Sequence, residues 1–172
     1  MRAMFCSAVL LCSVGCRSAD AQTAEMDVVV SSSDFTAGSP IPVDDTCYGS
    51  DVSPQLSWTS VPEATRSIAI VAEDVAGPST QWLVFNIDPN VHAVSRSTHA
   101  GVAATNDLGR IGYSGPCPRS SRLHTYRFTV YGLDTTLKLA PSAGRDAFNR
   151  AVAGHVVASG QLLGTFTRSA VP

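Results

Sequence analysis

The sequence lacks the features that mark nucleic-acid-binding and membrane-spanning proteins. No two Lys or Arg residues are adjacent, and a formal charge of −2 supplies no basic field for a phosphate backbone. The one continuous apolar stretch, Ala3 to Gly15, is shorter than the roughly 20 residues that a spanning helix needs. No Gly-x-Gly-x-x-Gly or Walker pattern occurs, so nothing supports a nucleotide site. We therefore predict no nucleic-acid partner and no transmembrane segment in the mature chain.

Metal-binding patterns are missing as well. The four histidines are scattered, and the sequence contains neither a Cys-x-x-Cys nor a His-x-His pair. A structural zinc site usually needs four ligands at specified spacings. We predict neither a metal site nor another cofactor.

The N-terminus has the pattern of a secretory leader. Arg2 is followed by an apolar segment, and Ala19-Asp20-Ala21 has the small-x-small form of a cleavage site. This pattern predicts a signal peptide over residues 1–21 and a single exported domain over residues 22–172, in the periplasm or cell envelope. Ser13-Val14-Gly15-Cys16 also resembles a lipoprotein box, so a lipid anchor at Cys16 is the alternative.

Two cysteines, Cys47 and Cys117, remain in the predicted mature domain. In an oxidising compartment they can form a disulfide. Two separate buried thiols are the alternative, because the sequence does not give the distance between the two Cα atoms.

Short runs rich in β-branched and aromatic residues recur along the chain, each bounded by Gly, Pro, Asn or Asp. Their length and number predict strands in one mostly β domain with an antiparallel sandwich. The one predicted helix runs from Ala143 to Val152, with Ser142 as its cap and Gly154 after it. The predicted strands are Val28–Val30, Leu56–Trp58, Ser67–Ala72, Trp82–Ile87, Tyr126–Leu133 and Leu162–Thr167.

Three polar side chains lie where predicted strands begin or end. Asp74 follows a run that is apolar on both faces, at a sheet rim where pockets often form, although an Asp beside Gly and Pro also commonly accepts hydrogen bonds within its own turn. His124 and Tyr126 alternate with Thr125 and so share one face of their strand. Imidazole and phenol are both donors suited to an anionic oxygen. The structural alternative is a satisfied core histidine covered by a tyrosine.

The segment from Asn106 to Pro118 holds three Gly and two Pro in thirteen residues. This density predicts a constrained loop, which either presents backbone N–H groups to a ligand or only connects strands. Ser114, His124 and Asp74 are the residues of a hydrolase alternative. However, Gly112-Tyr113-Ser114-Gly115 lacks the second spacer of a Gly-x-Ser-x-Gly motif.

Taken together, these motifs resemble the phosphatidylethanolamine-binding protein family, and most closely its bacterial Raf-kinase-inhibitor-like subgroup. The resemblance covers about residues 33 to 168 and is most specific in the Asn106-to-Pro118 loop and in His124-Thr125-Tyr126. Its other motifs are Ser53-Pro54-Gln55-Leu56-Ser57-Trp58 with Pro62 and Thr65, Glu73-Asp74, Trp82 with Asn86-Ile87, and Gly154-His155-Val156-Val157 with Gly164.

The resemblance implies a sandwich of two antiparallel sheets with a few peripheral helices, and a small rim pocket for phosphate or phosphoethanolamine-type head groups. Asp74 matches the first Asp of the family's Asp-Pro-Asp-x-Pro turn, and His124 and Tyr126 match its His-x-Tyr pair. Val75, Ala76 and Gln81 stand where the family has Pro, Asp and His, so we expect weaker or altered anion binding. The candidate ligand-binding residues are Asp74, Gln81, Tyr113, Gly115, Pro116, His124 and Tyr126.

The expected function is therefore non-enzymatic binding of a small anionic ligand or phospholipid head group by an exported protein. The alternative is a protein-interaction module that inhibits a protease or kinase-like partner, as the resemblance to eukaryotic relatives implies. The sequence leaves a homodimer open.

Overall fold

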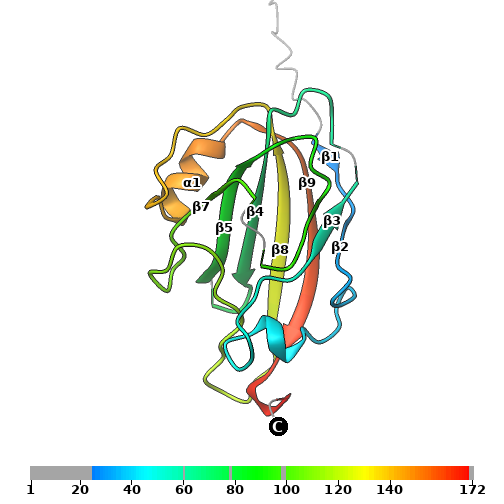
Figure 1. Cartoon of the computed structure of the whole chain (residues 1–172), viewed down its shortest axis with the longest axis vertical. Helices are drawn as coiled ribbons and strands as arrows, with labels where there is room; N and C mark the ends of the chain where they lie inside the picture. The colour runs from blue at the N-terminus through cyan, green and yellow to red at the C-terminus, as the bar shows by residue number, and fades with distance from the viewer. Residues whose placement is uncertain (1–24, 60, 78, 98–99, 171–172) are drawn as a thin grey trace, which may run out of the picture.

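Strand-forming residues organise most of the chain. A computed structural model describes residues 25–59, 61–77, 79–97 and 100–170. The predicted leader, its cleavage site after Ala21 and the lipid-anchor position Cys16 lie outside these ranges. Within them, nine strands form two sheets, accompanied by one α-helix and two short 3-10 helices (Figure 1). The predicted mostly β sandwich of two sheets is confirmed.

The larger sheet has the strand order β1-β9-β8-β4-β5-β7, and all its pairs are antiparallel except β1 with β9. The smaller sheet has the order β2-β3-β6 and is antiparallel. Figure 1 shows β2 and β3 in front of the β9 side of the larger sheet. The strands are β1 Met26–Asp27, β2 Val30–Ser31, β3 Leu56–Trp58, β4 Ser67–Asp74, β5 Ser79–Ile87, β6 Ala93–Val94, β7 Val102–Ala103, β8 His124–Leu133 and β9 Val156–Phe166.

Strand β4 lies inside the larger sheet because its side chains are apolar on both faces. Ile70 and its alternate neighbours pack in the core between the sheets, whereas Ala69 and Val71 pack in a second core on the outer face. A strand of this kind must be covered on both sides. The outer cover includes Phe148 of helix α1 (Arg145–Val152), a side chain that is 1% exposed.

Helix α1 begins later than the sequence predicts. It starts at Arg145 and not at Ala143, whose N–H group is already used in the preceding turn. The N-cap is Gly144 without a side-chain hydrogen bond, so the predicted cap at Ser142 is wrong. Gly154 follows the helix with φ +78°, the left-handed conformation that favours glycine at this position and that the sequence predicts.

Five of the six predicted strands overlap observed strands, although β9 begins at Val156, before the predicted Leu162–Thr167, and Val28–Val30 does not form one strand. The chain passes from one sheet to the other within this run, because the Val28 N–H donates to Ser159 O of β9 at 2.7 Å, whereas Val30 pairs with Trp58 of β3. Strands β1, β6 and β7 were not predicted. With two residues each, they are too short to show an alternating pattern.

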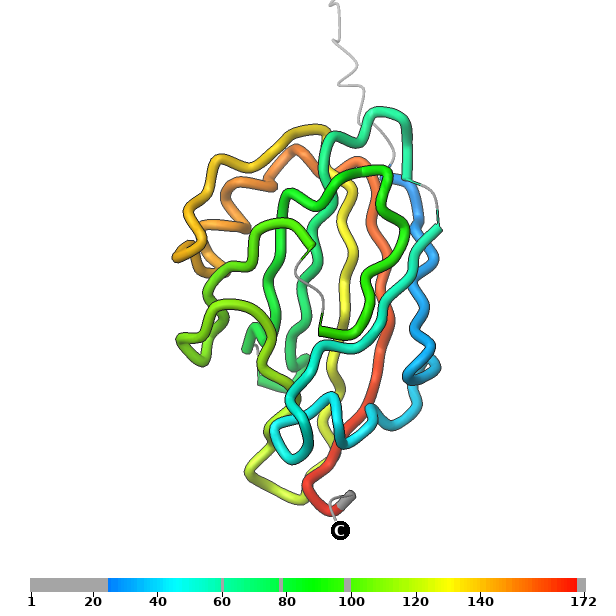
Figure 2. The backbone as a smooth tube through the Cα atoms, in the orientation of Figure 1, coloured from blue at the N-terminus to red at the C-terminus, as the bar shows by residue number. Residues whose placement is uncertain are grey.

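Cys47 and Cys117 form a disulfide, with their Cα atoms 5.4 Å apart. Of the two alternatives open from the sequence, the structure has the bridged one. The bridge joins the turn that follows the 3-10 helix η1 (Val43–Asp45) to the loop that leads into β8, and Figure 2 traces the two segments side by side. The Cys47 N–H also donates to Pro116 O at 3.2 Å, so the two segments are held together by backbone contacts as well.

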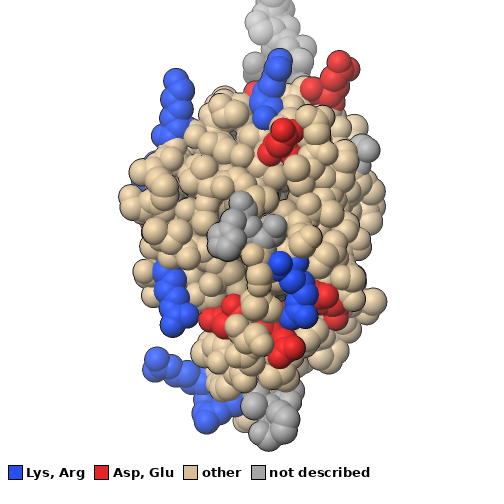
Figure 3. Space-filling model, in the orientation of Figure 1, with Lys and Arg blue, Asp and Glu red and all other residues tan. Residues whose placement is uncertain are grey.

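The second 3-10 helix, η2, is Arg168–Ala170 near the C-terminus. On the face shown in Figure 3, Lys and Arg lie among Asp and Glu and form no patch of one sign. No helix in the described ranges is long and apolar enough to cross a membrane.

Candidate functional site

The register of β4 and β8 brings Asp74, His124 and Tyr126 together. Asp74 ends β4 directly opposite Tyr126 of β8, and His124 lies two residues away from Tyr126 on the same face. Asp74 Oδ2 is 2.7 Å from His124 Nδ1. The structure therefore places the three predicted residues at one end of the sheet, as strand alternation requires.

Both carboxylate oxygens of Asp74 have hydrogen-bond partners. Oδ2 contacts the His124 imidazole, and Oδ1 accepts a hydrogen bond from the Ala76 N–H at 2.9 Å. The second contact is the turn interaction that an Asp in this sequence context commonly makes. The structural and the functional interpretation of Asp74 are thus both compatible with its geometry.

Tyr126 lies beneath the imidazole. The two rings stack at a centroid distance of 6.3 Å, and Tyr126 is 2% exposed. Burial, and then the nearby Asp74 carboxylate, raise the pKa of Tyr126, so the phenol keeps its proton. Among the described residues, its hydroxyl has no hydrogen-bond partner.

Gln81 is the extra residue of a bulge in β5, because Ala72 pairs with Trp82 while Glu73 pairs with Thr80. Its backbone oxygen accepts the Ser114 N–H at 2.9 Å. The side-chain Oε1 is buried, with no partner in the part of the chain that the structure describes. The backbone of Gln81 therefore holds the 106–118 loop in place, whereas the oxygen of its side-chain amide lacks a hydrogen bond within the described ranges.

The 106–118 loop uses several of its backbone N–H groups in hydrogen bonds to other parts of the protein. The N–H groups of Gly112, Ser114 and Gly115 donate to Ala104 O, Gln81 O and Asp51 Oδ1, the last at 2.6 Å. A Cβ atom on Gly115 would lie 2.3 Å from a backbone oxygen, so close packing requires glycine there. The loop thus acts here as a connection, which was one of the two predicted roles.

Tyr113 and Pro116 also contact the turn around residues 43–51. The Tyr113 hydroxyl donates to Asp45 O at 2.6 Å, and Pro116 O accepts the Cys47 N–H. These two predicted site residues, like Gly115, therefore hold the 106–118 loop against this turn. Within the described ranges, neither of them makes a hydrogen bond to Asp74 or His124.

Ser114 does not meet His124 in a hydrogen bond. Ser114 is 2% exposed, and its Oγ accepts from Asn106 Nδ2 at 3.0 Å. A serine nucleophile needs its general base within hydrogen-bond reach. The sequence did not single out the side chain of Asn106, yet this side chain fixes the conformation of the loop. Its Oδ1 also accepts hydrogen bonds from the N–H groups of Leu108 and Arg110.

The Asp74–His124 pair is partly buried, and the side chain of Asp74 is 11% exposed. Three cavities stand out among the described residues, and none is lined by Asp74, His124 or Tyr126. The His124 side chain is nevertheless 23% exposed. Val75 and Leu123, the chain neighbours of the pair, are exposed apolar residues. The arrangement offers a polar site at which the imidazole is partly exposed.

Asp45 is a buried acid that the sequence did not reveal. Its side chain is fully buried, Oδ1 lies 2.6 Å from Arg96 Nη2, and Oδ2 has no partner within the described ranges. Burial, the largest cause, raises the pKa of Asp45 to about 6. Nothing in the local sequence distinguishes it from its exposed neighbour Asp44.

Comparisons with known proteins agree with this fold. The family model described as phosphatidylethanolamine-binding protein matches residues 31–167. A UPF0098 protein of Methanothermobacter thermautotrophicus is 40% identical over 138 residues, which cover 74% of this chain and 91% of that protein.

Two solved structures are also similar. The phosphatidylethanolamine-binding protein homologue CT736 of Chlamydia trachomatis superposes with a TM-score of 0.78 and 30% identity, over 83% of this chain and 98% of that one. Escherichia coli YbcL superposes with a TM-score of 0.75 and 23% identity over 81% and 98% of the chains, a likeness in fold alone.

Proposed function

The chain belongs to the phosphatidylethanolamine-binding protein family, and from that premise we propose that it is an exported, non-enzymatic protein that binds a small anion at Asp74, His124 and Tyr126. Phosphate and phosphoethanolamine-type head groups are the anions in question. The observation that carries the proposal is the 2.7 Å contact between Asp74 Oδ2 and His124 Nδ1. It holds the imidazole in one orientation at a partly exposed position.

The group that this site leaves exposed to a ligand belongs to His124. Both Asp74 oxygens already accept hydrogen bonds, so they offer little to a further ligand cation. With Nδ1 bound to Asp74, His124 presents Nε2, which carries a proton in the imidazolium form. The protonated phenol of Tyr126 is a second donor. Charge-assisted hydrogen bonds of this kind are roughly twice as strong as neutral ones, which favours an anionic ligand.

The disulfide supports the proposed export. Bridges such as Cys47–Cys117 persist in oxidising compartments and are rare in the reducing cytosol. This agrees with a leader at the N-terminus, which the sequence predicts.

The chain provides a matched control for a binding test. Asp134 Oδ1 lies 2.8 Å from His155 Nδ1, which makes a second Asp–His pair, away from the Asp74–His124 pair along β8. The experiment is a titration with inorganic phosphate and with O-phosphorylethanolamine, followed by NMR of the histidine ring signals. We expect the His124 signals to move and those of His155 to stay.

Variants then assign the binding groups. His124→Gln should weaken binding roughly tenfold or more, because a hydrogen bond to a charged group contributes about 1.5–3 kcal/mol. Tyr126→Phe should weaken it less, and His155→Gln should leave it unchanged. A stationary His124 signal at saturating phosphate, or equal losses in both histidine variants, would contradict the proposal.

The non-enzymatic part has its own readout. Phosphorus NMR of O-phosphorylethanolamine incubated with the protein should show the ester intact. Release of inorganic phosphate that disappears in His124→Gln would show instead that the Asp–His pair acts as a general base.

A further inference from the structure

One of the three cavities lies on the inner side of the larger sheet, separate from the Asp74–His124 pair. Its volume is about 420 Å³, within the range of small-molecule sites. Trp82 and Val84 of β5 and Ala103 of β7 line it together with Tyr113. The smaller sheet covers the β9 side, so this cavity lies toward the β5 and β7 side of the sandwich (Figure 1).

The aromatic wall of this cavity is rigidly held. The rings of Trp82 and Tyr113 meet edge to face at a centroid distance of 5.6 Å, and the Tyr113 hydroxyl donates to Asp45 O at 2.6 Å. Ala100 and Ala103 leave open the volume that larger side chains would fill. An aromatic ring of a ligand would therefore meet an indole, a phenol and small apolar side chains without displacing any of them.

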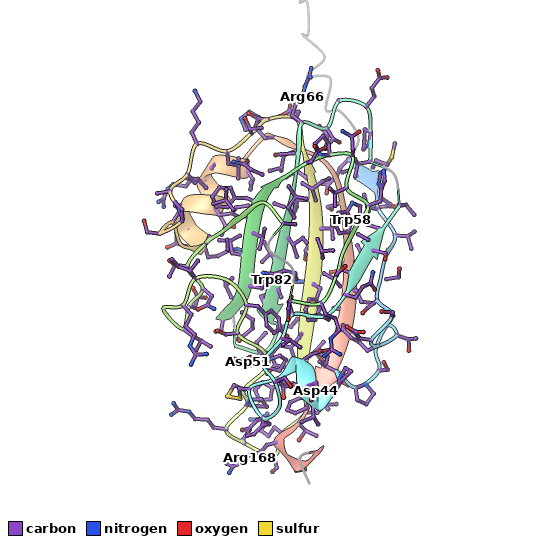
Figure 4. All side chains as sticks on the ribbon, viewed as in Figure 1. Asp44, Asp51, Trp58, Arg66, Trp82 and Arg168 are labelled. Atoms are coloured by element: carbon purple, nitrogen blue, oxygen red, sulfur yellow. A yellow bond between two sulfur atoms is a disulfide. The ribbon has the colours of Figure 1, made fainter. Side chains whose placement is uncertain are left out.

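The polar side of the cavity carries acceptors. Asp51, Ser53 and Ser97 line it, and Figure 4 shows Asp51 below Trp82. The Ser97 N–H donates to Ser53 O at 3.2 Å, which joins the two segments that carry these hydroxyls. Asp51 and Ser97 have φ values of 53° and 54°, and non-glycine residues in this strained region cluster at ligand-binding sites.

The Asp51 carboxylate is available to a ligand cation. Oδ1 accepts the Gly115 N–H, while Oδ2 lies 3.3 Å from Nη1 of Arg110, whose side chain is 66% exposed. An ion pair with so exposed a partner contributes little free energy, so a ligand ammonium can replace Arg110.

We propose that this cavity binds a small aromatic amine, with its ring against Trp82 and Tyr113 and its ammonium group at Asp51. The site is independent of the proposed anion site, because Asp74, His124 and Tyr126 do not line it. An apolar pocket with one charged group at its rim selects a ligand by the sign of its charge.

The test uses the two tryptophans of the chain. In a Trp58→Phe background, the remaining fluorescence comes from Trp82, because the sequence has two Trp residues. The probes are 2-phenylethylamine, neutral 2-phenylethanol and anionic 3-phenylpropionate, which share a ring and differ in charge. We expect saturable quenching or shift of Trp82 emission by the amine, at least tenfold weaker binding of the alcohol, and no binding of the acid.

Two variants examine the two halves of the cavity. Asp51→Asn keeps an acceptor for the Gly115 N–H and removes the charge, so amine affinity should fall about tenfold to the level of the alcohol. Asp44→Asn, at an exposed acid of the same turn, is the matched control and should change nothing. Ala103→Leu fills the cavity and should abolish binding of both amine and alcohol.

Equal affinities for amine and alcohol, or an Asp51→Asn variant that binds the amine as tightly as wild type, would overturn the assignment of Asp51. No change in Trp82 emission at millimolar amine would overturn the site as a whole. Unchanged amine binding in His124→Gln keeps this result separate from the anion site.

Discussion

The buried carboxylate of Asp45 should make the stability of this protein depend on pH in a direction opposite to that of a salt-bridged surface acid. Burial raises its pKa from 3.8 to about 6, and Arg96 opposes the shift without cancelling it. The folded protein therefore holds a proton on Asp45 more tightly than the unfolded chain does. Stability from this group is greatest below about pH 4 and is lost as the pH rises from about 4 to about 6.

The magnitude follows from the size of the shift. One pKa unit corresponds to about 1.36 kcal/mol, so a pKa that rises from 3.8 to about 6 corresponds to about 3 kcal/mol of unfolding free energy. Above about pH 7 the carboxylate is ionised in both states and adds no further slope. Its Oδ2 atom is buried without a partner in the described ranges, which agrees with burial as the main cause.

The assay compares wild type with Asp45→Asn by urea unfolding at several pH values between about 4 and 7. Asn does not titrate, so the pH dependence of all other groups cancels in the difference between the two proteins. We expect wild type to lose about 3 kcal/mol relative to the variant across this range. The variant also loses the ion pair with Arg96, which changes the difference in unfolding free energy by the same amount at every pH and so leaves its slope unchanged. A flat difference curve, or one that rises with pH, would refute the reasoning, and Asp44→Asn controls for loss of a neighbouring exposed acid.

Three further results are expected. Replacing Cys47 and Cys117 by Ser should lower the unfolding free energy by roughly 4 kcal/mol in the chain-entropy model, because the bridge closes a separation of 70 residues; denaturant unfolding measures this, and mass spectrometry of the unreduced wild type should find neither Cys47 nor Cys117 alkylated. Gln81→His, which gives the position a side chain that can become cationic, should raise phosphate affinity severalfold in calorimetry, and unchanged affinity would show that this position does not face the ligand. Gly115→Ala should lower Tm by several degrees because its Cβ would lie 2.3 Å from a backbone oxygen, whereas Gly77→Ala has open space and should be near neutral; equal Tm values would contradict the close packing.

The long strands were predictable because their side-chain patterns are local. The run from Ser67 to Ala72 is apolar at every position after the first, and the structure buries it on both faces as β4. The position of Val28–Val30 was not predictable, because the chain leaves one sheet for the other within three residues. Such a crossing depends on the partner strands and leaves no mark in the run itself.

The candidate site was predictable to the extent that strand alternation determines it. His124 and Tyr126 share a face because they are two residues apart, but the approach of Asp74 required the register between β4 and β8. Asp45 and Asp51 could not be identified, since their importance comes from what the fold packs against them. Asp45 is buried, and Asp51 contacts Gly115, which lies 64 residues further along the chain.

The two proposed sites share structural support but no binding residue. The turn around residues 43–51 contacts the 106–118 loop through the disulfide, the Tyr113 hydroxyl and the Gly115 N–H. Tyr113 lines the aromatic cavity, while the same loop reaches β5 through Gln81 O, close in sequence to the end of β4 that carries Asp74. A change that loosens this connection, such as reduction of the disulfide, should therefore weaken both kinds of binding together, whereas His124→Gln and Asp51→Asn should each affect one. If two sites share one support, reduction of the disulfide should weaken both anion binding and amine binding, and each variant should weaken only one of them. A single variant that weakens both would contradict this interpretation.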